Sequence, residues 1–141
     1  MSVTRPATRQ LLAIVELGGY PNFTPLYERH GYAVSSERSV RRAITLLRSL
    51  MPAVIVAEFN FQSDFRDRTS SLESLLATVQ RLYGESAGVR VIVLYEREFA
   101  HQLDRLLARF PVHATLAYPV DESMLESALV DDRDDGGSET K

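Results

Sequence analysis

The sequence predicts an α/β fold in which helices cover both faces of a doubly wound, five-stranded parallel sheet, giving a three-layer α/β/α sandwich. Short, continuous apolar runs of strand length alternate along the chain with segments whose apolar residues recur at helical spacing. Strands that are apolar throughout are typical of a parallel sheet buried on both faces, because right-handed crossovers place a helix over each strand pair. The length of 141 residues and the 45% hydrophobic content fit one such domain.

Five strands are expected, and three of them come from strong apolar runs. The first run is QLLAIVEL and closes at Gly18-Gly19, the third is VIVA and is ended by Glu58, and the fourth is VRVIVL. The other two strands have weaker patterns. The five expected strands are 10–17, 32–35, 54–57, 89–94 and 112–117.

Five helices are expected to alternate with these strands. Thr24 is the predicted cap of the first helix, with Pro25 in its first turn and Gly31 after its end. The next three helices place their apolar residues on one face and stop near a proline or a glycine. Asp121 is the predicted N-cap of the last helix. The five expected helices are 24–30, 39–50, 70–83, 99–110 and 121–129.

The composition excludes several kinds of site. The chain has no cysteine, which rules out disulfides, thiolate metal sites and cysteine nucleophiles and favours a reducing compartment. Its only lysine is Lys141, so no mechanism that needs a lysine within the fold applies. No apolar run reaches the roughly 18 residues of a spanning helix, and the first ten residues lack a secretory signal. We therefore expect a cytoplasmic protein that does not contact a membrane.

The charges divide the chain into a neutral body and an acidic end. The net charge is −3, and the segment 131–141 alone holds five acids and two bases, which leaves 14 of each in the remainder. We expect residues 1–8 to be an N-terminal extension, 9–130 the folded domain and 131–141 an acidic disordered tail. Because a neutral body exerts no general pull on nucleic acid, direct nucleic-acid binding is not expected.

Three stretches of the chain together resemble a known family. ERHGYAVSSERSVRRAITLLRSLMPAVIVAEF has a Gly-Tyr pair at the start of the second strand, a helix, and a proline before the third strand. VRVIVLYE resembles the family's fourth strand, and ATLAYPVDESMLESAL its fifth strand, X-Pro junction and last helix. Over roughly residues 9–130 the chain resembles the receiver domain of bacterial two-component response regulators. The resemblance implies a flavodoxin-like fold and a place in two-component signal transduction or a phosphorelay.

The resemblance also implies where a phosphorylation site would lie. A receiver has two magnesium-binding carboxylates after the first strand, a phosphate-accepting aspartate ending the third, a hydroxyl residue ending the fourth and a lysine after the fifth. The metal and the lysine neutralise a phosphoryl group that the carboxylates alone would repel. All five positions depart from this pattern, so we expect a vestigial phosphoacceptor pocket with no metal, no cofactor and no catalytic residue. Its positions are Glu16, Leu17, Glu58, Tyr95 and Tyr118.

The family's conformational switch is altered as well. Its fifth-strand aromatic position is held here by Thr115, whereas the bulky Tyr95 stands at the hydroxyl position. We interpret the chain as a pseudo-receiver fixed near one conformation, and mimicry of the phosphorylated state by Glu58 is a hypothesis. Two interpretations of Glu16 and Glu58 stay open: they share a proton or a cation, or they reach solvent or backbone donors as ordinary loop acids.

Four arginines fall within one arc of the helix predicted at 39–50, opposite its apolar face. This stripe either binds an acidic or phosphate-bearing partner or is a solvated surface, and the acidic tail is a candidate to dock on it. Its members are Arg38, Arg41, Arg42 and Arg48.

We expect a stand-alone, non-enzymatic, phosphorylation-independent receiver-like domain that acts by contact with a protein partner or as a homodimer. The resemblance implies the fourth helix, fifth strand and fifth helix as the contact surface. Two alternatives stay open. One is a small-ligand-binding or enzymatic flavodoxin-like domain with its site at the carboxyl ends of the strands, and the other is an atypical receiver that is still phosphorylated.

Overall fold

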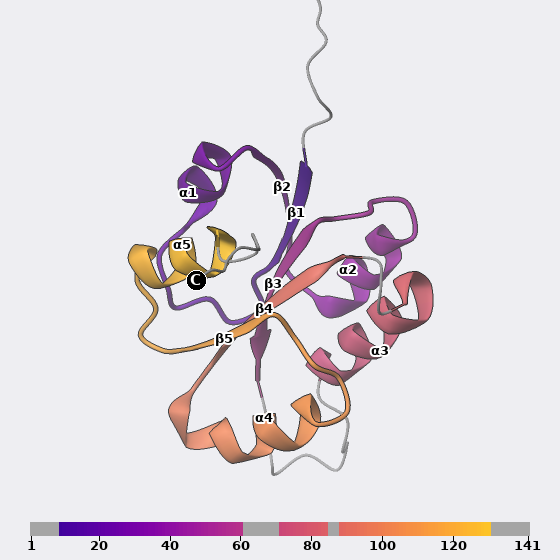
Figure 1. Ribbon diagram of the computed structural model, residues 1–141, viewed down its shortest axis with the longest axis vertical. Helices are drawn as coiled ribbons and strands as arrows, with labels where there is room; N and C mark the ends of the chain where they lie inside the picture. The colour runs from indigo at the N-terminus through magenta and orange to yellow at the C-terminus, as the bar shows by residue number, and fades with distance from the viewer. Residues whose placement is uncertain (1–8, 61–70, 85–87, 131–141) are drawn as a thin grey trace, which may run out of the picture.

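The computed structural model describes residues 9–60, 71–84 and 88–130, and it contains one parallel sheet of five strands (Figure 1). The strand order is β2-β1-β3-β4-β5, and every neighbouring pair is parallel. This is the doubly wound sheet that the sequence predicts. The strands are β1 (Arg9–Ile14), β2 (Tyr32–Glu37), β3 (Val54–Phe59), β4 (Arg90–Tyr95) and β5 (Ala114–Ala117).

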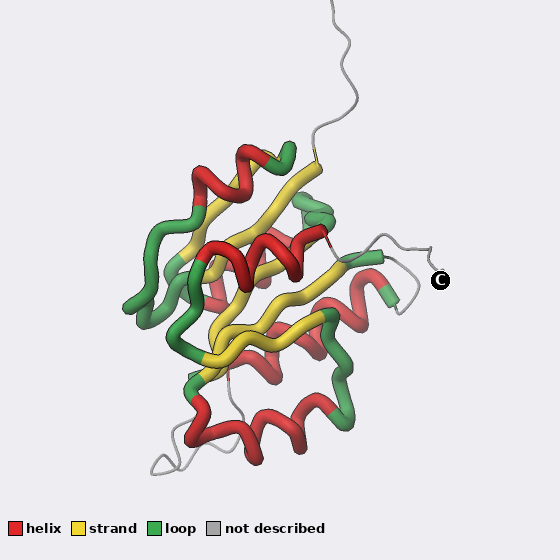
Figure 2. Tube along the Cα trace, turned by 60° about the vertical axis from the view of Figure 1, so that its left-hand side comes forward, coloured by secondary structure: helices red, strands yellow, loops and turns green. Residues whose placement is uncertain are grey.

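Helices lie on both sides of the sheet and complete the predicted three layers (Figure 2). Helices α1 and α5 pack on one face, and α2, α3 and α4 pack on the other. None of the helices in the described ranges is long and apolar enough to cross a membrane. The helices are α1 (Thr24–Arg29), α2 (Val40–Leu47), α3 (Ser71–Tyr83), α4 (Ala100–Leu107) and α5 (Glu122–Val130), with a 3-10 turn η2 (Arg97–Phe99) before α4.

The central strand β3 is buried along its whole length and separates two apolar clusters. Ile55, Ala57 and Phe59 join the cluster under α2, α3 and α4, whereas Val54 and Val56 join the cluster under α1 and α5. Successive side chains of a strand point to opposite faces. Glu58 therefore points to the face that α1 and α5 cover, from inside a buried strand.

The observed strand boundaries differ from the predicted ones by one to three residues, and two of these differences concern the site. Strand β1 ends at Ile14, not at Leu17; Val15 N still donates to Glu37 O at 2.8 Å, and the chain then leaves the sheet. Strand β3 continues to Phe59, so Glu58 lies within the strand and does not end it. Strand β1 ends early because the backbone amides that follow it bind the Glu58 side chain.

The observed caps and ends of three helices can be compared with the predicted ones. Ser39 caps α2, because its Oγ accepts from Arg42 N at 3.1 Å. The predicted cap at Thr24 is wrong: Phe23 is the N-cap of α1, and Thr24 N donates to Asn22 Oδ1 at 3.0 Å. The helices predicted at 39–50 and 99–110 are shorter, since α2 ends at Leu47 and α4 ends at Leu107.

Asp121 is confirmed as the cap of α5, and its ionisation is expected to make the stability of the protein depend on pH. Its Oδ1 accepts from Met124 N and from Ser123 Oγ, both at 2.9 Å. The backbone hydrogen bond from Met124, followed by the side-chain bond from Ser123, lowers the pKa of Asp121. A carboxyl with a lowered folded-state pKa stabilises the fold above its unfolded pKa, and this contribution is lost as the pH falls through the folded value.

The substitution Asp121→Asn tests this dependence, because asparagine keeps the capping acceptor but cannot ionise. We expect the wild type to exceed the variant in urea midpoint at pH 6, and the difference to shrink at pH values below about 4, where an unfolded aspartate is protonated. Asp104→Asn on α4 is the control for the loss of one exposed carboxylate. A difference between wild type and Asp121→Asn that stays constant with pH would contradict the prediction.

Candidate functional site

The carboxyl ends of β1, β3, β4 and β5 meet at one end of the sheet, where ligands gather in folds of this class. The buried acid Glu58 lies at this end, with only 1% of its surface exposed. A carboxylate at such a position needs hydrogen-bond donors, because burying an unpaired charge costs on the order of several kcal/mol of free energy. The donors of Glu58 therefore define the site.

Three consecutive backbone amides bind the Glu58 carboxylate. Oε2 accepts from Glu16 N at 3.0 Å and from Gly18 N at 3.3 Å, and Oε1 accepts from Leu17 N at 2.9 Å. Gly18 has a φ of +72°, a left-handed backbone conformation that glycine adopts without strain. Successive amides that converge in this way form a concave site for an anion. Here the anion is a side chain of the protein itself.

Two side chains complete the set of donors. Tyr20 Oη donates to Glu58 Oε2 at 2.9 Å, and Asn60 Nδ2 donates to Glu16 Oε1 at 3.0 Å and to Glu58 Oε1 at 3.3 Å. Burial, reinforced by the charge of Glu58, raises the pKa of Tyr20 above its ordinary value, so the phenol keeps the proton that it donates. The Asn60 amide links the two carboxylates. Glu58 thus binds backbone donors, as in the second interpretation given for Glu16 and Glu58 above. It does so from a buried strand, however, and not from a loop.

Aromatic rings pack beside this hydrogen-bond network. The rings of Tyr20 and Tyr118 stack with centroids 6.0 Å apart, and Tyr20 stacks on Phe23 at 6.2 Å. Burial, followed by the charges of Glu58 and Glu96, raises the pKa of Tyr118. A phenol therefore stands where the resemblance implies a lysine, and it brings no positive charge to the carboxylates.

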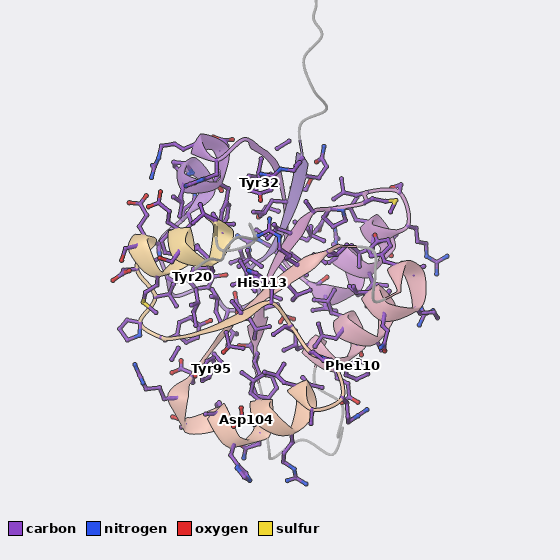
Figure 3. All side chains as sticks on the ribbon, in the orientation of Figure 1. Tyr20, Tyr32, Tyr95, Asp104, Phe110 and His113 are labelled. Atoms are coloured by element: carbon purple, nitrogen blue, oxygen red, sulfur yellow. The ribbon has the colours of Figure 1, made fainter. Side chains whose placement is uncertain are left out.

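The structure brings some of the predicted site residues together and separates others. Glu16, Glu58 and Tyr118 lie in or beside the network, but Leu17 contributes only its amide, and its side chain is 72% exposed. Tyr95 packs against the cluster under α2, α3 and α4, on the opposite face of the sheet from Tyr20 (Figure 3). Thr115 is exposed on β5 and pairs with Val93.

The arginine stripe lies outside this network. All four residues are exposed: two lie in the first turn of α2, one lies just before the helix, and one is its C-cap. The residues are Arg38, Arg41, Arg42 and Arg48.

The residues present do not fit the magnesium ion that the resemblance implies. Magnesium requires oxygen ligands in near-octahedral geometry. Both oxygens of Glu58 face N–H or O–H donors, Glu16 Oε1 faces the Asn60 amide, and the side chain of Leu17 has no ligand atom. Within residues 9–60, 71–84 and 88–130, no group of three or more histidine, aspartate or glutamate side chains is arranged to hold a metal ion.

Two adjoining cavities open beside the network. One of about 370 Å³ is lined on its two sides by the segment from Gly18 to Pro21 and by the segment from Tyr118 to Val120. The other, of about 390 Å³, lies between Leu17, Asn60 and the turn that carries Glu98. Both are lined by Gly18, Glu96 and Tyr118. The carboxylates of Glu96 and Glu98 give this end of the sheet an anionic rim.

Comparison with known proteins identifies the fold. No protein-family model and no curated protein sequence matches the chain. A receiver domain protein from Methanospirillum hungatei superposes with a TM-score of 0.69 at 11% identity, over 89% of this chain and 94% of that one. The chemotaxis protein CheY4 from Vibrio cholerae gives 0.67 at 15% identity, over 87% and 97% of the two chains. The fold is that of response-regulator receiver domains.

A third structure with the receiver fold comes from the streptococci and is described as one of a family of redox sensors that evolved from two-component response regulators. It superposes with a TM-score of 0.65 at 12% identity, over 86% of this chain and 49% of the other. At these identities the comparisons show the fold alone.

Sequence reasoning missed most of the donors in the site. Gly18, Tyr20 and Asn60 are not among the predicted site residues, and Glu16 and Leu17 are predicted for their side chains and not for the backbone amides that bind Glu58. One signal was present: Gly18-Gly19 directly follows an apolar run, and both glycines have positive φ values, of 72° and 80°. A tight turn explains such a pair equally well, so the pattern alone does not predict an anion-binding loop.

Proposed function

We propose that this chain is a phosphorylation-independent receiver-like domain that regulates a signalling partner through protein–protein contact. The observation that carries the proposal is the state of Glu58, which takes the place of the phosphate-accepting aspartate. Its carboxylate accepts hydrogen bonds from five donors of the same chain. The residue at the phosphate-accepting position is therefore already bound by uncharged hydrogen-bond donors of the same chain.

This network opposes phosphoryl transfer for two reasons. An attacking carboxylate oxygen must present a lone pair in line with the phosphorus atom, and both oxygens of Glu58 are already held by donors. An incoming phosphoryl group would also meet the acidic rim formed by Glu96 and Glu98 without a lysine to offset its charge. Positioning and electrostatic stabilisation are the main sources of catalysis in phosphoryl transfer, and neither is supplied here.

A domain that does not respond to phosphorylation must act by presenting a surface. The partly buried Tyr95 packs against the core cluster on the α4 side, and β5 carries the small, exposed Thr115, which supports a single resting conformation. The surface formed by α4, β5 and α5 is the proposed contact with a protein partner or a second copy. The streptococcal neighbour, described as a redox sensor that evolved from response regulators, supports a use of the fold outside the response regulators themselves.

The test is incubation with acetyl phosphate and magnesium, followed by intact-mass measurement, with a phosphorylatable receiver domain in the same mixture as the positive control. We expect no phosphoryl adduct on this chain while the control is modified. A labile adduct that the substitution Glu58→Gln abolishes would overturn the proposal and support an atypical, phosphorylated receiver.

A second candidate function is the binding of a small ligand at the carboxyl ends of the strands. The observation that favours it is the pair of adjoining cavities that share Gly18, Glu96 and Tyr118. Native mass spectrometry of the protein purified from cells distinguishes the two candidates. A co-purifying small molecule that is lost with Tyr118→Ala would favour ligand binding over a purely protein-contacting role.

A further inference from the structure

The arginine stripe is an unpaired, strongly charged surface, and we call its four residues the arginine face. Other arginines of the fold have partners: Arg29 pairs with Glu122, and Arg109 pairs with Glu73. In the described part of the chain, no side chain of the arginine face forms an ion pair or a hydrogen bond. The arginine face consists of Arg38, Arg41, Arg42 and Arg48.

Three of these four charges lie at a position that is unfavourable for the isolated fold. Arg41 and Arg42 lie in the first turn of α2, Arg38 lies just before it, and this turn contains no acidic residue. The backbone dipoles make the N-terminal end of a helix positive, so cations there are repelled by the helix and by one another. An anion placed on this surface would relieve both repulsions.

The chain itself supplies an anionic segment. Residues 131–141 read DDRDDGGSETK, hold five acids against two bases and directly follow α5. Four of the acids are aspartates within five consecutive positions, which matches the four guanidinium groups of the arginine face in number. The net charge of the whole protein resides in this segment.

The end of α5 is linked through Arg90 to the start of β3. Arg90 Nη1 donates to Leu129 O at 3.0 Å, and the backbone N–H of the same residue donates to Ala53 O at 2.9 Å. Ala53 follows Arg48 by five positions. The last described turn of α5 therefore lies at the edge of the sheet where the strands begin, near the stretch of chain that joins α2 to β3.

The length of the segment limits how much of the arginine face its acids can reach. Eleven residues span about 36 Å when extended, and the eight residues of α2 rise about 12 Å along the helix axis. The four aspartates lie within about 17 Å of Val130 along an extended chain, so Arg48, at the end of α2 nearest to β3, is the arginine expected to meet them first. The linkage within one chain gives such a segment an effective concentration in the millimolar range.

We propose that the acidic segment 131–141 docks on the arginine face of the same molecule and covers it against other anionic partners. This intramolecular contact goes beyond the proposed function and does not depend on it, because it involves neither Glu58 nor the acetyl phosphate experiment. Ion pairs on an exposed surface are screened by salt, so the contact is expected to weaken between about 0.05 M and 0.5 M salt.

The experiment measures how tightly a fluorescent peptide, DDRDDGGSETK, binds the full-length protein at low salt. In the tail variant the aspartates at 131, 132, 134 and 135 become asparagine, which removes the competing internal segment. With an effective concentration of about 1 mM and an intrinsic dissociation constant of about 0.1 mM, the peptide should bind the tail variant about tenfold more tightly than the wild type.

Two further variants locate the binding surface on the tail-neutralised background. The substitutions Arg41→Gln, Arg42→Gln and Arg48→Gln should abolish peptide binding. The matched control removes three exposed arginines from α3, η2 and α4 and should leave the affinity unchanged. Its substitutions are Arg81→Gln, Arg97→Gln and Arg105→Gln.

Three results would overturn the proposal. If the peptide binds the wild type and the tail variant with equal affinity, the segment 131–141 does not compete for the arginine face, which is then free to bind a separate acidic partner. Peptide binding that survives loss of the arginine face would place the contact elsewhere. A concentration-dependent dimer that the tail substitutions abolish would place the segment on a second copy. None of these results would change the outcome expected with acetyl phosphate.

Discussion

Replacing Glu58 with leucine is expected to lower the free energy of unfolding by about 4 kcal/mol, since a hydrogen bond to a charged group contributes about 1.5 to 3 kcal/mol and an unpaired buried group costs about 1 to 3 kcal/mol. Leucine has a similar volume but accepts nothing. Five donors, three of them backbone amides, would lose their acceptor. The expected loss is smaller than the sum for five separate hydrogen bonds, because the loop of residues 16–18 is partly exposed and its freed amides can bind water instead.

Two more variants separate the charge of Glu58 from its shape. In Glu58→Gln an NH₂ group must face at least two donors, because each carboxylate oxygen accepts from at least two groups. We expect a loss of about 2 to 3 kcal/mol. Glu58→Ala leaves the amides of residues 16–18 around an empty anion site. A tenfold excess of formate over its dissociation constant should then restore about 1.4 kcal/mol, and neutral formamide should not.

Urea unfolding followed by circular dichroism measures all three variants. If Glu58→Leu costs less than about 1 kcal/mol, the range of an ordinary surface substitution, the carboxylate network does not hold the loop after β1. Equal rescue of Glu58→Ala by formate and formamide would show that the site left behind has no preference for an anion.

The apolar pattern was sufficient to predict the sheet, because each buried strand must exclude polar residues over its length. Strands β3 and β4 were both found from runs of valine and isoleucine. The weak pattern of β5 gave a strand that is two residues too long at its start, since this edge strand is only half buried. Edge strands need less apolar surface than central ones, so their ends are less visible in a sequence.

The sequence predicts where the site lies but not which groups contact one another within it. Glu16 and Tyr118 follow the ends of β1 and β5 as expected, whereas Glu58 lies inside β3, one residue before its end. The binding of Glu58 by backbone amides was not expected, because an amide of residue 16, 17 or 18 looks the same in any sequence. The apolar Leu17 extended the predicted first strand by continuing the run, whereas the contact with Glu58 bends the chain away from the sheet after Val15. A long-range polar contact thus overrode a local pattern.

Arg90 is the second polar residue on which the fold depends. It opens β4 and is half buried; its Nη1 donates to Leu129 O at 3.0 Å and its Nη2 to Tyr32 Oη at 2.8 Å. Tyr32 is itself buried and starts the edge strand β2, with the guanidinium carbon of Arg9 lying 4.6 Å from its ring centre. One guanidinium therefore connects a central strand, an edge strand and the end of α5.

Replacing Arg90 with methionine is expected to cost about 3 kcal/mol, because two charge-assisted hydrogen bonds are lost and a phenol and a carbonyl lose this donor. Arg90→Lys should recover less than half of the loss, since one ammonium cannot reproduce the fork of the guanidinium. Tyr32→Phe removes one bond and should cost about 1 kcal/mol. The double variant with Arg90→Met should then cost less than the two single losses together, as expected for groups in contact. Strict additivity would show that the bond from Arg90 to Tyr32 contributes nothing to stability, and the whole effect of Arg90 would then have to pass through the end of α5.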